Sequence, residues 1–275
     1  MKVATWNVNS LRVRLPQVLA WLAQEQPDVL ALQETKVTDD AFPAVPLQAL
    51  GYDTLYSGEP SYNGVALLSR RPPTEVQIGI PGFADPQRRC IAASYAASDL
   101  PGGSLRVVNL YVPNGQSVGS ERYAYKLHWL SRLNDWLRTE LSERPSLLVL
   151  GDYNIAPDDR DVHDPIAWKD HIAVSVPERL AFCGLLDLGL TDAFRLFEPL
   201  AGHFSWWDYR TDAFRRNLGL RIDHILVSQP LVGGCIACHI DRAPRKAVRP
   251  SDHAPVVVEI AVPATNQTID STPLT

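Results

Sequence analysis

Apolar residues gather into short runs along this chain, and several of the runs end in acidic or amide side chains. Residues 146–150 hold four large aliphatic side chains in succession. They lack the alternation of a strand with one face in water, so they predict a strand that is buried on both faces. Gly151, Asp152 and Asn154 follow directly, and Pro157 marks the end of the strand. Open α/β sheets bind ligands at the carboxyl ends of their strands, although Gly, Asp and Asn are also common turn residues.

The same arrangement recurs at other predicted strands, and this recurrence favours a shared site over unrelated turns. Strands are predicted at residues 2–8 and 28–35, and each ends in polar side chains. Strands are also predicted at residues 222–228 and 256–260, and polar side chains lie at or just before their first residues. Acidic, amide or imidazole side chains therefore mark several strand ends. They are Asn7, Glu34, Asp152, Asn154, Asp223, Asp252 and His253.

Helical spacing predicts three helices between the strands. Apolar residues recur at this spacing after Ser10, which is expected to cap a helix that ends before Pro27. The longest predicted helix covers residues 121–141, and another covers residues 178–188. Short strands, separated by Gly and Pro, are predicted at residues 52–56, 65–68, 76–80, 90–97 and 105–112. This alternation of strands and helices predicts an α/β fold.

The composition is that of an ordinary globular protein with a mild acidic excess. The 275 residues include 26 Lys and Arg and 31 Asp and Glu, for a formal net charge of −5. This balance argues against a protein that coats nucleic acid non-specifically. We expect one domain over residues 1–262, because no linker composition interrupts it, followed by a disordered tail at residues 263–275.

The first residues contain no apolar segment of signal-peptide length, since Asn7, Asn9 and Arg12 interrupt it. No apolar run approaches the ~20 residues that a membrane-spanning helix needs. We therefore expect a cytoplasmic monomer without a membrane partner.

One cysteine motif has a literal match to a cofactor site. Cys235, Cys238 and His239 follow the CxxCH pattern of covalent haem attachment. We discount haem because the motif is short and no export signal precedes it. A zinc site would need a second ligand pair, which the sequence lacks. The simpler interpretation is a buried strand that carries two thiols.

The polar groups at the strand ends suit one kind of chemistry. Carboxylate and amide oxygens are typical ligands of Mg²⁺, whereas no cluster of soft ligands favours zinc or copper. Asp252 lies beside His253 in the sequence, and a further carboxylate such as Asp223 could orient the imidazole. Metal-assisted phosphodiester hydrolysis requires a cation at the phosphate oxygens, a carboxylate that accepts the proton of water, and donors for the developing charge.

Seven short motifs, in order along the chain, carry a resemblance to a known family. They are WNVNSLR at residues 6–12, LQETK at 32–36, YNGVA at 62–66, YVPNG at 111–115, GDYNIAP at 151–157, GLRID at 219–223 and SDHAP at 251–255. Together they resemble the exonuclease III family of apurinic/apyrimidinic endonucleases, within the endonuclease/exonuclease/phosphatase superfamily. The resemblance covers about residues 1–262. It implies a four-layer α/β sandwich, in which two mixed β-sheets pack face to face between flanking helices.

The resemblance also implies Mg²⁺ as the cofactor, with Mn²⁺ as a substitute, and double-stranded DNA with abasic sites or 3′ ends as the partner. The catalytic residues it implies are Tyr111, Asp152, Asn154, Asp223 and His253. The metal ligands it implies are Asn7, Glu34, Asp152, Asn154, Asp252 and His253. In this scheme Glu34 is the principal metal carboxylate and Asp152 activates water, while Asp223 orients His253 toward the scissile phosphate. Asp252 is either a metal-side or a hydrogen-bonding carboxylate, and one-metal and two-metal schemes both stay open.

A segment dense in aromatic residues, at 204–210, precedes a run of arginines. Aromatic faces and guanidinium groups suit an extruded or baseless nucleotide with its flanking phosphates, although core aromatics beside a solvated loop would give the same pattern. The expected wall beyond the phosphate consists of Trp206, Trp207 and Leu220, with residues 172–175 as the opposite rim. The expected DNA-binding residues are Asn9, Arg12, Asn63, Asn114, Trp206, Trp207, Arg210, Leu220 and Arg221.

The sequence thus predicts a metal-dependent DNA repair nuclease that acts at abasic sites and at 3′ ends. The superfamily also contains inositol-phosphate and lipid phosphodiesterases with similar metal residues, so hydrolysis of a non-DNA phosphoester is an alternative. A catalytically inactive DNA-binding module is a second alternative. Such a module would be expected to have lost Glu34, Asp152 or His253, and all three residues are present.

Overall fold

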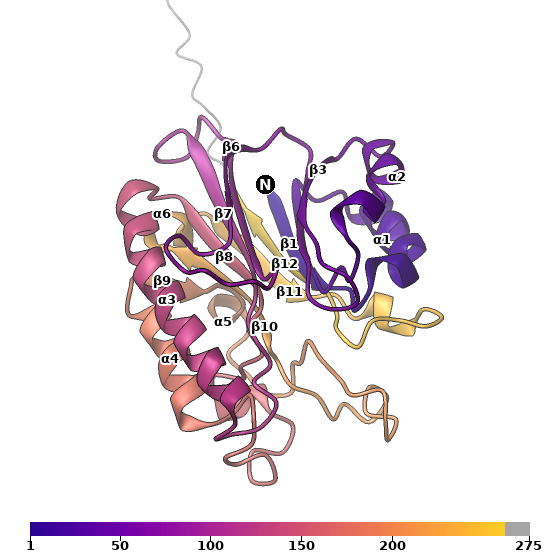
Figure 1. Ribbon diagram of the computed structural model, residues 1–275, viewed down its shortest axis with the longest axis vertical. Helices are drawn as coiled ribbons and strands as arrows, with labels where there is room; N and C mark the ends of the chain where they lie inside the picture. The colour runs from indigo at the N-terminus through magenta and orange to yellow at the C-terminus, as the bar shows by residue number, and fades with distance from the viewer. Residues whose placement is uncertain (262–275) are drawn as a thin grey trace, which may run out of the picture.

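Two six-stranded sheets lie face to face, with helices on both outer faces, in the computed structural model (Figure 1). The structure describes residues 1–261, so the tail predicted at residues 263–275 lies outside the described residues. The first sheet has the strand order β11-β12-β1-β2-β4-β3, and the second has the order β5-β6-β7-β8-β10-β9. Each sheet is mixed, because β1 pairs with β2 and β7 pairs with β8 in parallel while the other pairs are antiparallel. The predicted four-layer sandwich is confirmed.

For the long helices and strands, the observed bounds are close to the predicted ones. The strands are β1 (Lys2–Asn7), β2 (Val29–Gln33), β3 (Asp53–Ser57), β4 (Val65–Ser69), β5 (Thr74–Ile78), β6 (Cys90–Ala96), β7 (Ser104–Tyr111), β8 (Leu147–Asp152), β9 (Leu190–Asp192), β10 (Asp223–Ser228), β11 (Cys235–Ile240) and β12 (Val256–Ile260). The α-helices are α1 (Leu11–Glu25), α2 (Ala44–Gln48), α3 (Glu121–Glu143), α4 (Val176–Leu186), α5 (Ala193–Phe197) and α6 (Gln229–Val232). Short 3₁₀ turns are η1 (Asp39–Ala41), η2 (Asp159–Asp161) and η3 (Ala243–Lys246). No helix within residues 1–261 is long and apolar enough to cross a membrane.

The strand β8 shows why the two sheets and their helices form four layers. Successive side chains of a strand point to opposite faces. Leu148 and Leu150 face the core between the two sheets, whereas Leu147 and Val149 face a second core beneath α3 and α4. The helix α1 covers the outer face of the other sheet in the same way. A strand with an apolar cover on both faces needs apolar residues at every position, which is the pattern of this run.

Gly151 is required where β8 passes closest to β7. A Cβ atom at this residue would lie 1.9 Å from the main-chain oxygen of Leu110, and the φ angle of Gly151 is +145°. The strand does not end at this glycine, as its sequence suggests, but continues to Asp152. The close approach of the two strands therefore fixes the position of the first catalytic candidate.

The start of α1 is held by the chain that follows β2 rather than by the predicted cap. Ser10 has a φ angle of 89° and its side chain makes no capping hydrogen bond, so the expected N-cap is wrong. Instead the main-chain N–H of Ser10 donates to the oxygen of Glu34 at 2.8 Å, and that of Leu11 donates to Thr35 at 3.0 Å. The ends of β1 and β2 are thereby joined.

The strand that carries the CxxCH motif lies at an edge of the first sheet. Cys238 is buried in β11, but Cys235 is only partly buried and His239 is exposed. Both thiols are free. The expectation of a buried strand is therefore only half right, because an edge strand with a bulge near Cys235 keeps part of its surface in water.

Candidate active site

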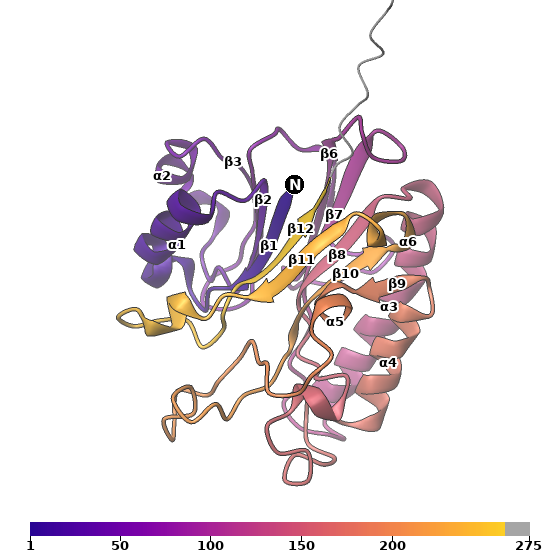
Figure 2. The same cartoon turned by 180° about the vertical axis from the view of Figure 1, so that it is seen from behind.

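Five polar residues from separate strands and loops meet where the two sheets come together at one end. Asn7 ends β1, and Glu34 directly follows β2. Asp152 ends β8, and Asp223 lies opposite it as the first residue of the antiparallel strand β10. His253 lies in the turn before β12. In Figure 2 the orange loop after α5 extends below the sheets, and the yellow loop after β11 extends to their left.

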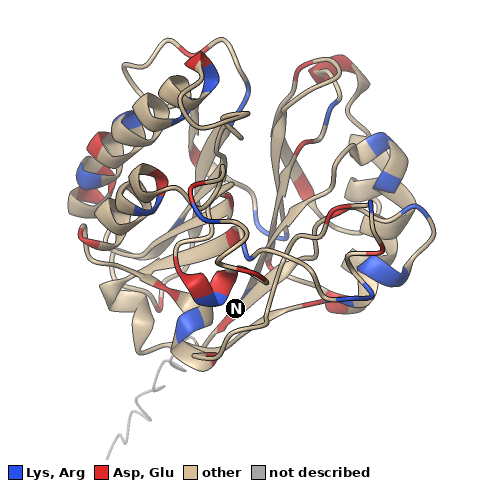
Figure 3. Cartoon of the chain, turned by 90° about the horizontal axis from the view of Figure 1, so that it is seen from below, with Lys and Arg blue, Asp and Glu red and all other residues tan. Residues whose placement is uncertain are grey.

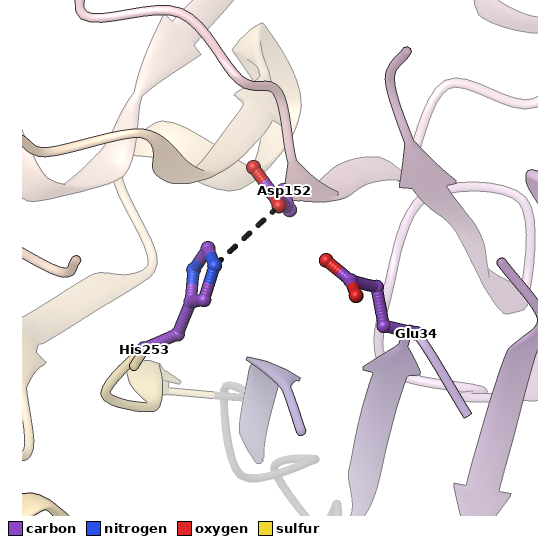
Figure 4. A group of neighbouring side chains, drawn as sticks. All are labelled: Glu34, Asp152 and His253. Carbon is purple, nitrogen blue, oxygen red and sulfur yellow. Dashed lines mark ion pairs between the residues drawn. The ribbon is translucent and has the colours of Figure 1, made fainter. Parts of the chain in front are cut away.

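Three of these side chains could hold one cation. Oxygen atoms of Glu34 and Asp152 and a ring nitrogen of His253 all lie within 4.8 Å of one another. Figure 4 shows the three side chains pointing toward a common centre. Asn7 joins the two acids, because its Nδ2 donates to Glu34 Oε1 at 2.8 Å and to Asp152 Oδ2 at 2.9 Å. Its Oδ1 accepts from the main-chain N–H of Asn9 at 2.9 Å. Asn7 was predicted as a metal ligand, but in this orientation its amide holds the ligands in place.

The imidazole of His253 is fixed by a carboxylate and a hydroxyl behind it. Nδ1 of His253 lies 2.9 Å from Asp223 Oδ2, and its Nε2 faces Asp152 Oδ2 at 3.8 Å. Ser205 donates to Asp223 Oδ2 at 2.6 Å and accepts the main-chain N–H of Asp223 at 3.0 Å. This chain of contacts leaves the Nε2 edge of the ring as the one directed into the site.

The carboxylate of Asp152 is held by the loop that follows it. Its Oδ1 accepts the main-chain N–H of Asn154 at 2.9 Å, and its Oδ2 lies 3.3 Å from Asn154 Nδ2. Asn114 donates through Nδ2 to the side-chain oxygen of Asn154 at 3.0 Å. The guanidinium of Arg89 stacks on the ring of Tyr111 at 4.7 Å, on the strand beside Asp152. Asp152, Asn154 and Asn114 thus belong to one hydrogen-bonded network.

Burial and neighbouring charges shift pKa values in directions that suit hydrolysis. Burial raises the pKa of Asp152 to about 7, against the opposing effect of the His253 imidazolium. Burial alone would lower the pKa of His253, but the carboxylates of Asp223 and Asp152 outweigh it and raise that pKa to about 10. Burial, followed by the charges of Glu34 and Asp152, raises the pKa of Tyr111 well above its usual value. At neutral pH the site therefore holds an imidazolium, a neutral phenol and a carboxyl group that can exchange a proton.

Three residues at the site have a left-handed backbone, which non-glycine residues rarely adopt. The φ angles are 52° for Glu34, 53° for Lys36 and 50° for Asn154. Strained positions of this kind cluster at functional sites, where surrounding contacts hold them. Here Ser10 donates to the main-chain oxygen of Glu34, and the ammonium of Lys126 donates to that of Asn154 at 2.7 Å.

Asp252 takes the hydrogen-bonding role of the two that were predicted for it. Its Oδ1 accepts from Asn9 Nδ2 at 2.9 Å, and its Oδ2 accepts from Trp206 Nε1 at 3.0 Å. Within residues 1–261 the group that could hold a metal does not include Asp252. Burial would raise the pKa of Asp252, but the charge of His253 and then these hydrogen bonds outweigh burial and keep that pKa below its usual value. The structure thus shows hydrogen-bonding contacts of Asp252, and a metal-side role for it stays a prediction.

The predicted DNA contacts divide into exposed and buried groups. Arg12, Asn114 and Arg210 are exposed, and Asn9 and Trp206 are partly exposed. Arg12 lines a surface groove of about 750 Å³ together with Lys36 and Arg249. Figure 3 shows Lys and Arg residues interspersed with Asp and Glu on the lower side of the molecule.

Several predicted DNA contacts are corrected by their burial. Trp207 is 0% exposed, Leu220 2% and Arg221 1%. Arg221 forms ion pairs with Asp161 at 2.6 Å and with Asp192 at 2.7 Å, so its charge is paired inside the protein. Asn63, another predicted contact, is also buried and donates to Glu59. These side chains support the loops at the site but do not present their polar groups to a ligand.

Comparison with known proteins identifies the chain. The model of the Endonuclease/Exonuclease/phosphatase family matches residues 4–253. Exodeoxyribonuclease III of Haemophilus influenzae is 38% identical over 268 residues, which cover 94% of this chain and 99% of that protein. This chain belongs to the endonuclease/exonuclease/phosphatase family, in its exonuclease III branch. It is a hydrolytic nuclease.

Two solved structures of this branch have the same architecture. The 3′ phosphatase NExo from Neisseria, bound to a product DNA hairpin, has a TM-score of 0.91 and 46% identity, covering 94% of this chain and 99% of that one. An AP endonuclease from Archaeoglobus fulgidus has a TM-score of 0.90 and 39% identity over the same shares of the two chains. The strand-end cluster therefore lies in a fold that other nucleases of the branch share.

The donor set of the exonuclease III-type site fits a hard divalent cation. Glu34 and Asp152 provide carboxylate oxygens, and the cysteines of the chain take no part in the group. Glu34 is partly exposed, so an incoming ion and its water can reach it. The carboxylates of Asp223 and Asp152 outweigh burial and raise the pKa of His253 to about 10, so the predicted coordination by this residue would require loss of its ring proton.

Three residues of the site were not predicted from the sequence. Lys36 forms an ion pair with Glu34 at 2.7 Å, and its ammonium also donates to Asn9 at 2.6 Å. Ser205 supports Asp223 from within the aromatic segment. Lys126 was one of several polar positions on a long helix. Only Lys36, which stands two residues after Glu34 in a family motif, was close enough in sequence to be suspected.

Proposed function

We propose that this nuclease is a metal-dependent DNA repair enzyme that hydrolyses the phosphodiester beside an abasic site and also processes 3′ ends, acting as a cytoplasmic monomer with Mg²⁺. The observation that carries the proposal is the convergence of Glu34, Asp152 and His253, with Asp223 behind the imidazole. The exonuclease III and AP endonuclease relatives supply the class of substrate.

The chain supplies a proton acceptor and a charged donor on opposite sides of one small space. Asp152 is proposed to accept the proton of the attacking water, because its pKa is raised to about 7 and it is still largely ionised at slightly alkaline pH. His253, held by Asp223, is proposed to donate through Nε2 to a phosphate oxygen. Tyr111 and Asn154 complete the set of donors for the phosphate. Glu34 is proposed to hold Mg²⁺, which would offset the negative charge of the phosphate when bound.

Hydrolysis of a non-DNA phosphoester remains the alternative, and one experiment separates the two. Purified enzyme with Mg²⁺ would be given a duplex with a single abasic site, a duplex with a 3′-phosphate at a nick, and an inositol phosphate. The proposal predicts cleavage of the first two substrates and none of the third at equal concentration. Preferred hydrolysis of the inositol phosphate would contradict it.

The wall beside the phosphate supports a pocket for an extruded sugar. Trp206 forms a β-bridge with His253, and it packs against Leu220 and Ile222 in a small apolar cluster that also includes Ala173. The sequence placed Trp207 in this wall, but Trp207 lies in a separate buried cluster behind it. Trp206 is therefore the partly exposed aromatic residue of the pair, and it packs against Leu220.

Trp206→Ala is expected to reduce cleavage at an abasic site by about ten- to a hundredfold, since loss of stacking costs about 1–3 kcal/mol. Ala173 was predicted at the opposite rim, but it is 5% exposed and belongs to the same apolar cluster as Trp206, so Ala173→His should disturb this packing and reduce cleavage of both substrates. Both activities would be measured on matched duplexes at one salt concentration, because phosphate contacts make affinity salt-dependent. Equal losses on both substrates in Trp206→Ala would show that Trp206 supports general DNA binding rather than the choice of substrate.

A further inference from the structure

A buried ammonium lies directly beneath the loop that holds Asp152. Lys126 is on α3, and its side chain is 0% exposed. Its Nζ donates to the main-chain oxygen of Asn154 at 2.7 Å and to that of Asn114 at 3.3 Å. It also forms an ion pair with Glu178, which is equally buried. The three groups that this ammonium contacts lie in the loop after β7, in the loop after β8 and at the start of α4.

Glu178 extends the same network to the predicted rim. At the start of α4 its Oε1 accepts the main-chain N–H of Ala173 at 3.1 Å. Its Oε2 accepts from the main-chain N–H of Ser175 at 3.2 Å and from the Ser175 hydroxyl. That hydroxyl also contacts the hydroxyl of Tyr123, one turn before Lys126 on α3, at 2.7 Å. The pair thus joins the loop after β8 to the segment at residues 172–175.

We propose that the Lys126–Glu178 pair is a positioning device that sets the place of Asn154, and through it the carboxylate of Asp152. Asn154 has a φ angle of 50°, and its main-chain N–H is one of the donors that fix Asp152. The ammonium holds the carbonyl of that same residue, so it stabilises a backbone conformation that Asn154 would otherwise tend to leave. The inference rests on the proposed function, because it concerns how the proposed proton acceptor is held.

The stability of the fold alone does not explain why a buried ion pair stands at this place. Taking two charges out of water is costly, and apolar residues of similar volume often serve the fold as well or better. An apolar pair, however, has no donor for the carbonyls of Asn154 and Asn114. The three donors of an ammonium can reach both carbonyls and the carboxylate at once. The geometry around Lys126 uses all three.

The chain offers a matched control on the same helix. Arg106 on β7 forms a buried ion pair with Glu140 near the other end of α3, at 2.8 Å. The two side chains are 2% and 8% exposed, and their partners do not include a residue of the site. Removing Arg106 takes the closest cation from a buried carboxylate, as in Lys126→Met, but away from the catalytic loop; Glu140 keeps contacts with Trp136 at 3.0 Å and with Arg144 at 3.5 Å.

The experiment compares Lys126→Met, Arg106→Met and the double variant Lys126→Met/Glu178→Gln with the wild type. Folding would be followed by circular dichroism, and kcat and KM on an abasic duplex would be measured below the melting range of every variant. Lys126→Met is expected to lower kcat by about 10²-fold with little change in KM, because small misplacements of catalytic groups have effects of that size. Arg106→Met is expected to lose a similar amount of thermal stability without this loss of kcat.

The double variant keeps the test decisive if Lys126→Met folds poorly. It removes both buried charges, so thermal stability should return toward that of the wild type, although the single side-chain oxygen of Gln can accept from Ser175 or from Ala173 but not from both. The kcat should stay low, since no ammonium holds Asn154. Recovery of kcat together with stability would overturn the inference, as would equal kcat values for Lys126→Met and Arg106→Met.

The affinity for Mn²⁺ tests the position of Asp152 without the need for a substrate. Lys126→Met is expected to bind Mn²⁺ about 10–100-fold more weakly than the wild type, which is the usual effect of losing a contact that orients a metal ligand. Unchanged Mn²⁺ affinity would count against the inference. If the wild type binds Mn²⁺ but fails to cut abasic DNA, the proposed function fails while this test of positioning still stands.

Discussion

Asp152→Asn is expected to lower kcat for cleavage at an abasic site by about 10²–10⁴-fold, the range typical of general acid–base catalysis. The amide keeps the shape of the side chain and can still accept the main-chain N–H of Asn154. It cannot accept a proton from water, which is the role proposed for Asp152. Single-turnover rates would measure the chemical step, and circular dichroism would confirm that the variant is folded. Near wild-type turnover in a folded Asp152→Asn enzyme would show that the proton goes elsewhere.

The pH profile gives a second readout of the same residue. Asp152 must be ionised to accept a proton, and burial raises its pKa to about 7 before a cation binds. The kcat/KM of the wild type should therefore rise with pH up to about 7 and level off above it. A bound cation favours the ionised carboxylate, so a higher Mg²⁺ concentration should move this rise to lower pH. The Asp152→Asn variant should lack the rise.

Exhaustive chelation is expected to abolish measurable cleavage, and added Mg²⁺ or Mn²⁺ should restore it. The site offers few protein ligands, and Glu34 is partly exposed, so a bound ion should exchange readily with solvent. The melting temperature should change little on chelation, because the three apolar cores lie on the faces of the sheets, away from the metal ligands. Full activity after chelation would exclude the metal-dependent scheme.

The layers of the fold could be predicted because burial dictates the sequence of each long strand. The run at residues 147–150 is apolar at every position, and in the structure it has a core on each face. The three longest helices also follow from their apolar spacing. Short elements such as α2, α5 and β9 could not be predicted, since three to five residues do not establish a period.

The acidic groups of the site could be predicted because they directly follow or precede strands, and neighbouring strand ends meet at one edge. Glu34, Asp152 and His253 were found in this way and lie together. The roles of Asp252 and Asn7 depended on side-chain orientation, which a strand pattern does not contain. Within the described chain Asp252 faces Asn9 and Trp206 instead of the metal group.

The supporting residues could not be predicted, because their partners lie far away in the sequence. Arg221 was expected at the DNA since it follows a basic run, but Asp161 and Asp192 neutralise it in the interior. Lys126 stands on a helix with many polar residues, and only the fold brings it to Glu178 and Asn154. In both cases a buried charge and a solvated one have the same appearance in the sequence.

The central claim is that Glu34, Asp152 and His253 form one metal-dependent catalytic centre, and titration with Mn²⁺ tests it most directly. Binding would be followed by the electron paramagnetic resonance of free Mn²⁺ for the wild type, Glu34→Gln and the control Glu75→Gln, whose carboxylate is largely exposed on β5. The account predicts specific binding in the wild type and in Glu75→Gln, and binding about 10–100-fold weaker in Glu34→Gln, with a matching rise in the Mn²⁺ concentration needed for cleavage. Equal Mn²⁺ affinity in the wild type and Glu34→Gln would contradict it.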